Sequence, residues 1–111
     1  MLIEQIIREY LESKLTVPVY TEQPEAPPGK YILTDRTGGS ESNRIRRATF
    51  AVQSYAGSLA EAAALNEEVK NALDNAGAGD GILHAQLNSD YNFTDTAKRK
   101  HRYQAVYEIY Y

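Results

Sequence analysis

An alanine-rich segment, residues 58–76, places the strongest constraint on the fold of this chain. It reads SLAEAAALNEEVKNALDNA. Ser58 followed three residues later by Glu61 has the pattern of a helix capping box, and alanine has the highest helix propensity. We predict that this helix ends at Gly77. The alanines of this helix allow close approach to a sheet. The apolar residues form one stripe along the helix: Leu59, Ala62, Ala63, Leu65, Val69, Ala72 and Leu73.

The residues before this helix predict a first helix and a short strand. Residues 2–14 carry apolar side chains at helical spacing, with charged residues between them. Residues 17–20 form a short apolar stretch whose Pro18 favours an edge or irregular strand. The prolines and glycine of residues 21–30 predict a stiff loop, because they exclude regular structure.

Two long strands follow, with a polar segment between them. Residues 30–38 are rich in β-branched and aromatic side chains, which favours a strand. Residues 45–56 alternate with a period of two, and we expect the side that carries Phe50 and Val52 to face the core. The segment between them, GGSESNR, predicts a loop at the tip of a long hairpin, because glycine and small polar residues favour turns.

The last thirty residues predict two closing strands, 82–93 and 102–111, joined around residues 94–100. The KRKHR run before the last strand is expected to form a turn and the start of that strand. Alternate residues of the last strand predict an ordinary core face: Tyr103, Ala105, Tyr107 and Ile109.

This order of elements predicts one α+β domain over residues 1–111. We expect a mostly antiparallel β-sheet with an N-terminal helix and a central helix packed on it. The length suits a single domain. A domain of this size often gains stability from oligomerisation, because it buries a modest share of its surface.

The composition excludes several classes of site and suggests a compartment. The chain has no cysteine, which excludes disulfides, thiol nucleophiles and cysteine-ligated metals. The amino terminus lacks the basic start and long apolar run of a signal peptide, and no segment has the length of a membrane span. We therefore expect a soluble protein that stays in the cell where it is made and has no membrane partner.

Two patterns resemble ligand-binding motifs but have the wrong order. In residues 75–81, NAGAGDG, the glycines follow a helix and precede a strand, whereas a dinucleotide site needs the opposite arrangement. Residues 88–99 start like a calcium-binding loop. Phe93 then stands where that loop needs glycine, and Arg99 stands where it needs glutamate. Neither segment predicts a cofactor or a metal.

No group of residues in the sequence has the pattern of a catalytic site. His84 and His101 are the only histidines, and they lie in separate predicted strands without metal-ligand spacing. Nothing places either histidine beside a nucleophile and an orienting acid. We therefore predict that the protein is not an enzyme and needs no cofactor.

The charges of the chain are arranged in blocks, although the net charge is only −3. Residues 57–97 carry one basic and seven acidic side chains. Such segregation can form complementary patches between copies of one chain. The candidate residues for a subunit interface or a channel lining are basic: Arg44, Arg46, Arg47, Lys98, Arg99 and Lys100.

The nine tyrosines leave two interpretations open. Aromatic side chains near basic residues can stack on bases of single-stranded nucleic acid. Tyrosine is also common in cores and protein interfaces, since its ring buries area while its hydroxyl tolerates water. The acidic overall charge favours core and interface roles over nucleic-acid binding.

Five segments are informative when taken together in their order and spacing: RTGGS (36–40), ATFAVQSYA (48–56), EAAALNEEVKNAL (61–73), NSDYNFTD (88–95) and RYQAVYEIYY (102–111). Together they resemble tail-completion proteins of long-tailed bacteriophages and prophages, which are also called tail terminators or tail-to-head joining proteins. The resemblance covers almost the whole chain. No single segment is a catalytic motif, and the family provides no active-site residues.

The resemblance implies a structural role in virion assembly. Such a protein forms a ring, expected to be a hexamer, that caps the finished tail tube and provides the surface for the filled head. Its partners would be copies of itself, the tail tube protein and a head-completion or connector protein, with DNA passing through the channel. It would be located in the tail or neck of the virion after assembly in the cytoplasm of the bacterial host.

The predicted hairpin loop is the candidate contact with a neighbouring subunit or the tail tube. We expect its deletion to spoil assembly and to leave the monomer folded. Three alternatives remain open: another phage neck or minor tail component, such as a head-completion or adaptor protein; a single-stranded nucleic-acid-binding module; and a small enzyme, which a ligand or metal bound to the purified protein would reveal. The loop residues are Gly38, Gly39, Ser40, Glu41, Ser42 and Asn43.

Overall fold

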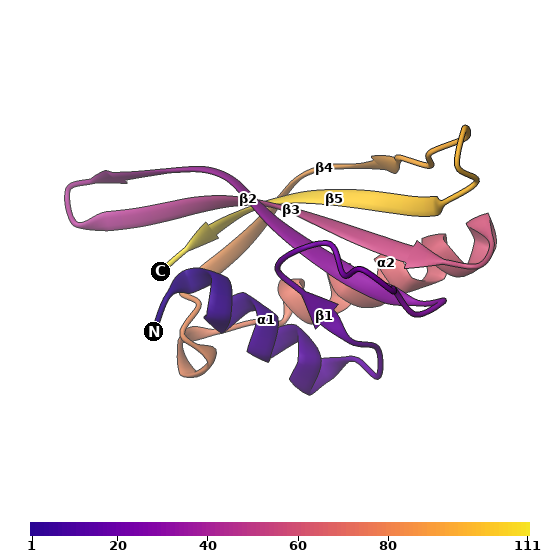
Figure 1. Cartoon of the computed structure of the whole chain (residues 1–111). Helices are drawn as coiled ribbons and strands as arrows, with labels where there is room; N and C mark the ends of the chain where they lie inside the picture. The colour runs from indigo at the N-terminus through magenta and orange to yellow at the C-terminus, as the bar shows by residue number, and fades with distance from the viewer.

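Two helices lie on one face of a five-stranded sheet, and the other face of the sheet has no helix (Figure 1). The computed structural model describes all residues, Met1–Tyr111. The α+β fold with an N-terminal and a central helix, predicted from the sequence, is confirmed. The elements in chain order are α1 (Ile3–Lys14), β1 (Val19–Tyr20), β2 (Tyr31–Ser42), β3 (Ile45–Ala56), α2 (Leu59–Asp74), the 3₁₀ helix η1 (Ala78–Asp80), β4 (His84–Asn92) and β5 (His101–Tyr110).

The sheet has the strand order β1-β2-β3-β5-β4. All neighbouring strands are antiparallel except β1, which pairs in parallel with β2 at Ile32 and Leu33 only. The short β1 therefore covers a small part of one edge of the sheet, as the proline in this segment predicted. The opposite edge is β4 along its whole length.

The core lies between the helices and the covered face of the sheet. The predicted alternation of β3 is confirmed, since Phe50 and Val52 are buried in this core. In β5, Ala105, Tyr107 and Ile109 join them as predicted, whereas Tyr103, predicted for the same core face, is only partly buried. The helices contribute Ile3, Ile7, Tyr10 and Leu11 from α1, and Leu65, Val69 and Leu73 from α2. Val19, Ile32 and Ile82 add further large apolar side chains to this core.

The central helix begins where the sequence predicts and ends earlier. The Ser58 side chain caps the helix by accepting a hydrogen bond from the Glu61 backbone N–H at 3.2 Å. The helix ends at Asp74, so the prediction that Gly77 ends it was wrong: Gly77 is extended, with φ −145°. The left-handed glycine is Gly81, with φ 81°, because the chain makes one turn of 3₁₀ helix before β4.

The apolar stripe of α2 also differs from the prediction at two positions. Leu59, which stands at the first position of the helix, is 41% exposed. Asn66 is buried in its place, since the covered face of the helix follows the spacing 62, 65, 66, 69 and 73. The sequence pattern missed Asn66 because a polar residue does not contribute to an apolar stripe.

The segment predicted as a loop between the two long strands is mostly strand. Gly38, Gly39, Ser40, Glu41 and Ser42 belong to β2 and pair with β3, so their prediction as a loop was wrong. The turn consists of Asn43 and Arg44 alone, and both have positive φ, 51° and 66°. This geometry is that of a type I′ turn, whose twist matches that of a two-stranded hairpin. Strand pairing outweighs the local preference of glycine for turns, because each of the residues 38–42 has a partner on β3.

Candidate assembly interface

The β2–β3 hairpin extends past the helices as a two-stranded arm, which we define as residues 37–47 (Figure 1). Side chains from Asp35 to Arg46 are exposed, on both faces of the ribbon. Ile45, close to the tip, is 58% exposed. An isolated two-stranded ribbon is only marginally stable in water. The arm therefore has the properties of a segment that becomes covered by a partner.

The root of the arm is held in place by Arg36. A bulge between Arg36 and Gly38 shifts the β2–β3 register. The Arg36 side chain folds back over the strand, where its Nε donates to the Gly38 carbonyl at 3.2 Å. Its guanidinium also lies 3.6 Å from Glu4 of α1. These contacts fix the angle at which the arm leaves the domain.

The three arginines of the arm have different surroundings. Arg46 lies over the Tyr111 ring, with its guanidinium carbon 4.8 Å from the ring centre. Arg47 pairs with Glu108 of β5 at 3.6 Å. Arg44 stands in the turn and makes no side-chain hydrogen bond or ion pair. Arg44 is thus the arginine of the arm that is free to meet a partner.

The arginines of the arm form one basic cluster. A second basic cluster lies in the turn between β4 and β5, residues 93–100, which we call the basic turn. The Asp95 carboxylate accepts hydrogen bonds from the backbone N–H groups of Ala97 and Lys98, at 3.1 and 3.2 Å. This bonding orders the turn and leaves Lys98, Arg99 and Lys100 exposed. Arg99 has φ 53°, so this cluster also contains an arginine in the left-handed region.

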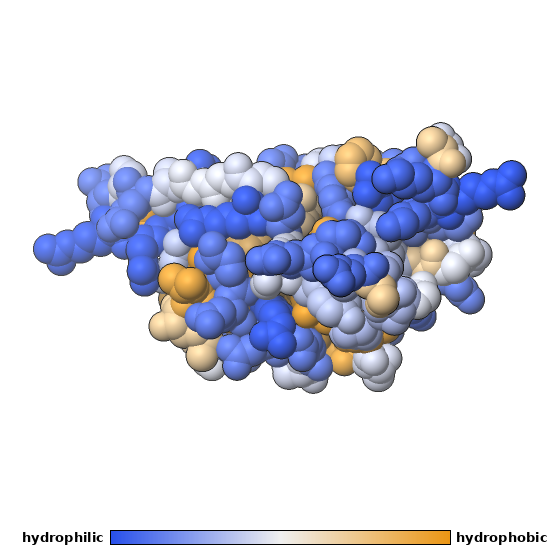
Figure 2. All heavy atoms as spheres, viewed as in Figure 1, coloured by the Kyte–Doolittle hydropathy of each residue, from blue (hydrophilic) through white to orange (hydrophobic).

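The structure does not bring the two basic clusters together within one subunit. Arg47 pairs with Tyr110, whereas Ala56, at the far end of β3, pairs with His101 beside the basic turn. Nine residue steps of β-strand separate these positions, which is about 30 Å. Figure 2 shows hydrophilic residues at both ends of the long axis of the molecule, whose extent is 44 Å. Any channel that both clusters line would need the full length of the sheet.

The sheet face that carries no helix, which we call the outer face, is covered by a chain of hydrogen bonds. Arg102 Nη1 donates to the Tyr55 hydroxyl at 2.9 Å, and Tyr55 donates to Gln53 at 2.8 Å. Gln53 donates to Gln104 at 2.9 Å, and Gln104 donates to the Tyr91 hydroxyl. Sequence reasoning missed this network, because it joins residues of three strands whose pairing the sequence does not specify. The network holds polar side chains in fixed conformations.

Two stacked aromatic rings cover one end of the outer face. Tyr31 and Tyr55 lie parallel, with their ring centres 4.5 Å apart. Both are buried although no helix covers them. Burial raises the pKa of the Tyr31 phenol above its usual value. Beside them is a cavity of about 140 Å³, lined by Pro27, Pro28, Gly29, Tyr31, Tyr55, Ala56, Arg99, Lys100 and His101.

On the covered side, two polar contacts join α2 to the last strands. Asp90 of β4 accepts hydrogen bonds from Asn66 at 2.7 Å and from Lys70 at 2.5 Å. The bond to Asp90 raises the pKa of the Lys70 ammonium. The Tyr107 hydroxyl donates to Asp74 at 3.0 Å. Burial is the main cause that raises the pKa of Tyr107, and the hydrogen bond to Asp74 raises it further. These contacts position β4 relative to the helix.

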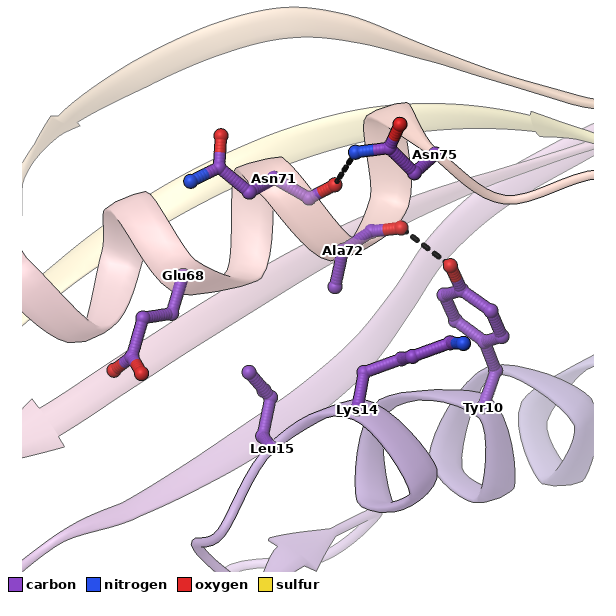
Figure 3. A pocket seen from close by; sticks show the side chains of 7 residues that line it. All are labelled: Tyr10, Lys14, Leu15, Glu68, Asn71, Ala72 and Asn75. Atoms are coloured by element: carbon purple, nitrogen blue, oxygen red, sulfur yellow. Dashed lines mark hydrogen bonds between the residues drawn. The ribbon is translucent and has the colours of Figure 1, made fainter.

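A shallow hollow of about 350 Å³ lies between the two helices (Figure 3). In Figure 3, the Tyr10 side chain points from α1 toward Ala72 of α2, and the Lys14 ammonium lies beside the Tyr10 ring. The Tyr10 hydroxyl donates to the Ala72 carbonyl at 2.5 Å and closes one side. The hollow is lined by one acidic side chain, one lysine and two amides, and no nucleophile contacts a general base there. We therefore assign the hollow to the packing of the two helices.

The structure contains neither a cluster of metal-ligating side chains nor a helix of membrane-spanning character. No group of three or more His, Asp or Glu side chains lies close enough together to hold a metal ion. His84 and His101 lie on different strands, as predicted. Neither helix has the length and apolar character to span a membrane.

Comparisons of the chain with protein-family models and with curated proteins found no match.

Proposed function

We propose that this protein is a structural component of phage assembly that forms a ring, caps the completed tail tube and joins the tail to the head. The observation that carries the proposal is the arm, a ribbon exposed on both faces that extends from an otherwise packed domain. A ring of head-to-tail subunits gives such an arm a neighbour to cover it. The proposal rests otherwise on the resemblance of the sequence to tail-completion proteins.

The backbone conformations of Arg44 and Arg99 support a contact role for both basic clusters. A left-handed conformation costs a residue with a Cβ about 1 kcal/mol. Glycine or asparagine would relieve this strain, yet an arginine stands at both positions. Strain that persists at a functional group is an indication of function. In the proposed ring, the two clusters meet neighbouring subunits, the tail tube, the head-completion protein or the DNA in the channel.

The proposed protein has no enzymatic activity, cofactor or membrane partner. It forms a homo-oligomer, with six subunits as the proposed number, and becomes part of the neck of the virion after assembly in the bacterial cytoplasm. The ordered polar side chains of the outer face suit this role, because a surface that is rigid before binding loses little entropy when it binds.

The first experiment measures the mass of the protein in solution by light scattering over a concentration series, with electron microscopy of any large species. Rings of about six subunits are expected either directly or after addition of purified tail tubes, where they should bind at tube ends. Absence of rings together with absence of binding to tube ends would refute the proposal.

A shortened-arm variant tests whether the arm is the contact. Replacing residues 41–46 by Asn-Gly keeps the pairing of Ser40 with Arg47, which is in phase with the present closing pair Ser42–Ile45, and supplies the preferred residues of a two-residue turn. The variant is expected to stay folded by circular dichroism and to lose ring formation and tube binding. Ser42→Ala, which keeps the arm, is the control. Normal assembly of the shortened variant would remove the arm from the proposed contact.

A second candidate function, single-stranded nucleic-acid binding, is favoured by one surface feature. Tyr91 and Phe93 are both 41% exposed beside the basic turn, and the Arg102 guanidinium lies 4.4 Å from the Phe93 ring centre. Bases can stack on such side chains. Titration with single-stranded oligonucleotides at several salt concentrations tests this candidate. Binding that weakens steeply with salt and is lost in Phe93→Ala would favour it over assembly.

No observation specifically favours another neck component, such as a head-completion or adaptor protein. This alternative predicts binding to the head portal side in place of tube ends. The tube-binding experiment therefore separates it from the tail-completion role.

A further inference from the structure

The edge of the sheet formed by β4 is open and weakly protected. β4 is the last strand, so alternate backbone N–H and C=O groups along its nine residues have no strand partner. Natural edge strands are usually blocked by lysine, proline or outward charges. β4 contains none of these, since its one charged residue, Asp90, is bound to Asn66 and Lys70 of α2. A bulge between Leu87 and Ser89 is its only protection.

The opposite edge of the sheet, formed by β2, is open along the arm. Nearer the domain, β1 covers β2 at Ile32 and Leu33. Beyond the bulge at Arg36, the edge of residues 38–42 pairs only with β3. This segment is also exposed on both faces. The domain thus presents two unpaired edges, one on each side of the sheet: nine residues in β4 and the five residues 38–42 in the arm.

The directions of the strands make these two edges compatible. The four long strands β2, β3, β5 and β4 are each antiparallel to the next. With an even number of such strands, β2 and β4 run in opposite directions. A neighbouring copy in the same orientation, as a ring requires, therefore places its β2 antiparallel to β4. Antiparallel pairing is slightly the more stable arrangement per residue.

The charges of the two edges are also complementary. The arm and its root, residues 36–47, carry four arginines and one acid, Glu41, which gives +3. Residues 57–97, which include α2 and β4, carry one base and seven acids, which gives −6. Beside β4, the Glu67 side chain is 65% exposed. A head-to-tail contact brings these two segments of opposite net charge together, whereas an arm–arm contact brings arginines together.

We propose that the arm of one copy, at residues 38–42, adds as an antiparallel strand to the open edge of β4 in the next copy. The sheet then continues across the subunit boundary. This inference rests on the proposed ring and names its contact. Main-chain hydrogen bonds supply the attachment in such strand addition, while the side chains and charges set the register.

Cysteine cross-linking tests this contact with little background, because the chain has no cysteine of its own. Four single variants are suitable: Ser40→Cys and Ser42→Cys on the arm, and Gln86→Cys and Ser89→Cys on β4. All four side chains lie on the outer face, since their register partners Arg47, Ile45, Glu108 and Val106 lie there. A disulfide forms only when the two α-carbons are about 4.4–6.8 Å apart, so the pair that cross-links reports the register.

Each variant is oxidised alone and in mixtures of one arm variant with one β4 variant, at high protein concentration and in the presence of tail tubes. We expect covalent dimers in at least one mixture and none from the β4 variants alone. Covalent dimers from a β4 variant alone would overturn the inference in favour of two-fold pairing of β4. Absence of any arm–β4 cross-link in all four mixtures would also overturn it.

The failure of this inference differs from failure of the proposed function. Rings or capped tubes without arm–β4 cross-links would leave the assembly role in place and remove this contact. Cross-links in solution without any binding to tube ends would support the contact and remove the phage role. A double variant that carries both cysteines of the pair that cross-links is expected to give a ladder of covalent oligomers that ends at the closed ring.

Discussion

Gly39 lies so close to Arg47 on the paired strand that a Cβ at Gly39 would stand 2.9 Å from the Arg47 carbonyl oxygen and 2.6 Å from the Arg36 guanidinium. The flexible Arg36 side chain can move, but the Arg47 carbonyl belongs to the backbone of β3. We therefore expect Gly39→Ala to separate the two strands of the arm and to destabilise the protein by about 1–3 kcal/mol. Chemical denaturation measures this loss, and hydrogen exchange of residues 38–47 locates it.

Gly38→Ala is the matched control for this prediction. A Cβ at Gly38 would meet only the Thr49 hydroxyl, at 4.0 Å, and the residue has no positive φ. We expect Gly38→Ala to change stability by less than about 0.5 kcal/mol. Equal effects of the two substitutions would show that the close approach of the strands at Gly39 is not what requires glycine there.

Replacing Arg44 by glycine is expected to stabilise the isolated protein. Asn43 and Arg44 both have positive φ, and Asn-Gly is the preferred pair for this two-residue turn. Replacing the arginine in this left-handed conformation should raise the free energy of unfolding by about 1 kcal/mol. If Arg44 contacts a partner, the same variant should assemble less well. Thermal unfolding and tube binding of Arg44→Gly are the two measurements, and a loss of stability would contradict the backbone argument.

Arg44→Ala separates strain from charge. Alanine has a Cβ and so retains the left-handed strain, while it removes the positive charge. Both variants are expected to lose assembly to the same extent, because they lack the same guanidinium. Assembly retained in either variant would show that the arginine side chain does not contribute to the contact.

The sequence predicted the elements well where local chemistry decides the structure. The capping residue Ser58 and the period of two around Phe50 and Val52 placed α2 and β3 at nearly their observed bounds. The glycines at 38 and 39 were misleading, because glycine favours turns locally but also permits the close strand pairing seen against Arg47. The pairing of β2 with β3 is what makes the chain follow the second of these two glycine preferences.

The features of the candidate interface were less predictable. The sequence indicated the basic residues but not that β3 holds Arg47 and the basic turn at opposite ends of the sheet. Strand order is a long-range property, and hence the open edge of β4 and the network around Gln53 could not be read from local patterns. Asn66 was missed since its partner, Asp90, lies on another element.

The contact of Asp90 with α2 is expected to hold β4 in place. Asp90→Ala leaves Asn66, which is buried, and the Lys70 ammonium without their shared acceptor. An unsatisfied buried polar group costs about 1–3 kcal/mol. We expect a loss of stability in this range, together with faster hydrogen exchange in β4 than in β3. Gln86→Ala, an exposed change on the same strand, is the control. Unchanged exchange of β4 in Asp90→Ala would contradict this role.

The Tyr107–Asp74 contact predicts how stability responds to alkaline pH. Burial and the bond to Asp74 raise the pKa of Tyr107 in the folded protein above its unfolded value of about 10. The folded state therefore keeps the phenolic proton at a pH where the unfolded chain releases it. The stabilisation is fully present below pH about 10 and is lost as pH rises above that value, by up to about 1.4 kcal/mol per pH unit.

Tyr107→Phe removes the titrating group and tests this prediction. At neutral pH the variant is expected to be less stable by about 1 kcal/mol, because it lacks the hydrogen bond to Asp74. As pH rises from 9 to 11, in roughly the range of the unfolded phenol pKa, the difference between the two proteins should shrink. Denaturation at several pH values measures the difference, with Tyr103→Phe, whose hydroxyl makes no hydrogen bond, as the comparison. A difference that stays constant or grows would show that Tyr107 is not protonated more tightly in the folded protein than in the unfolded chain.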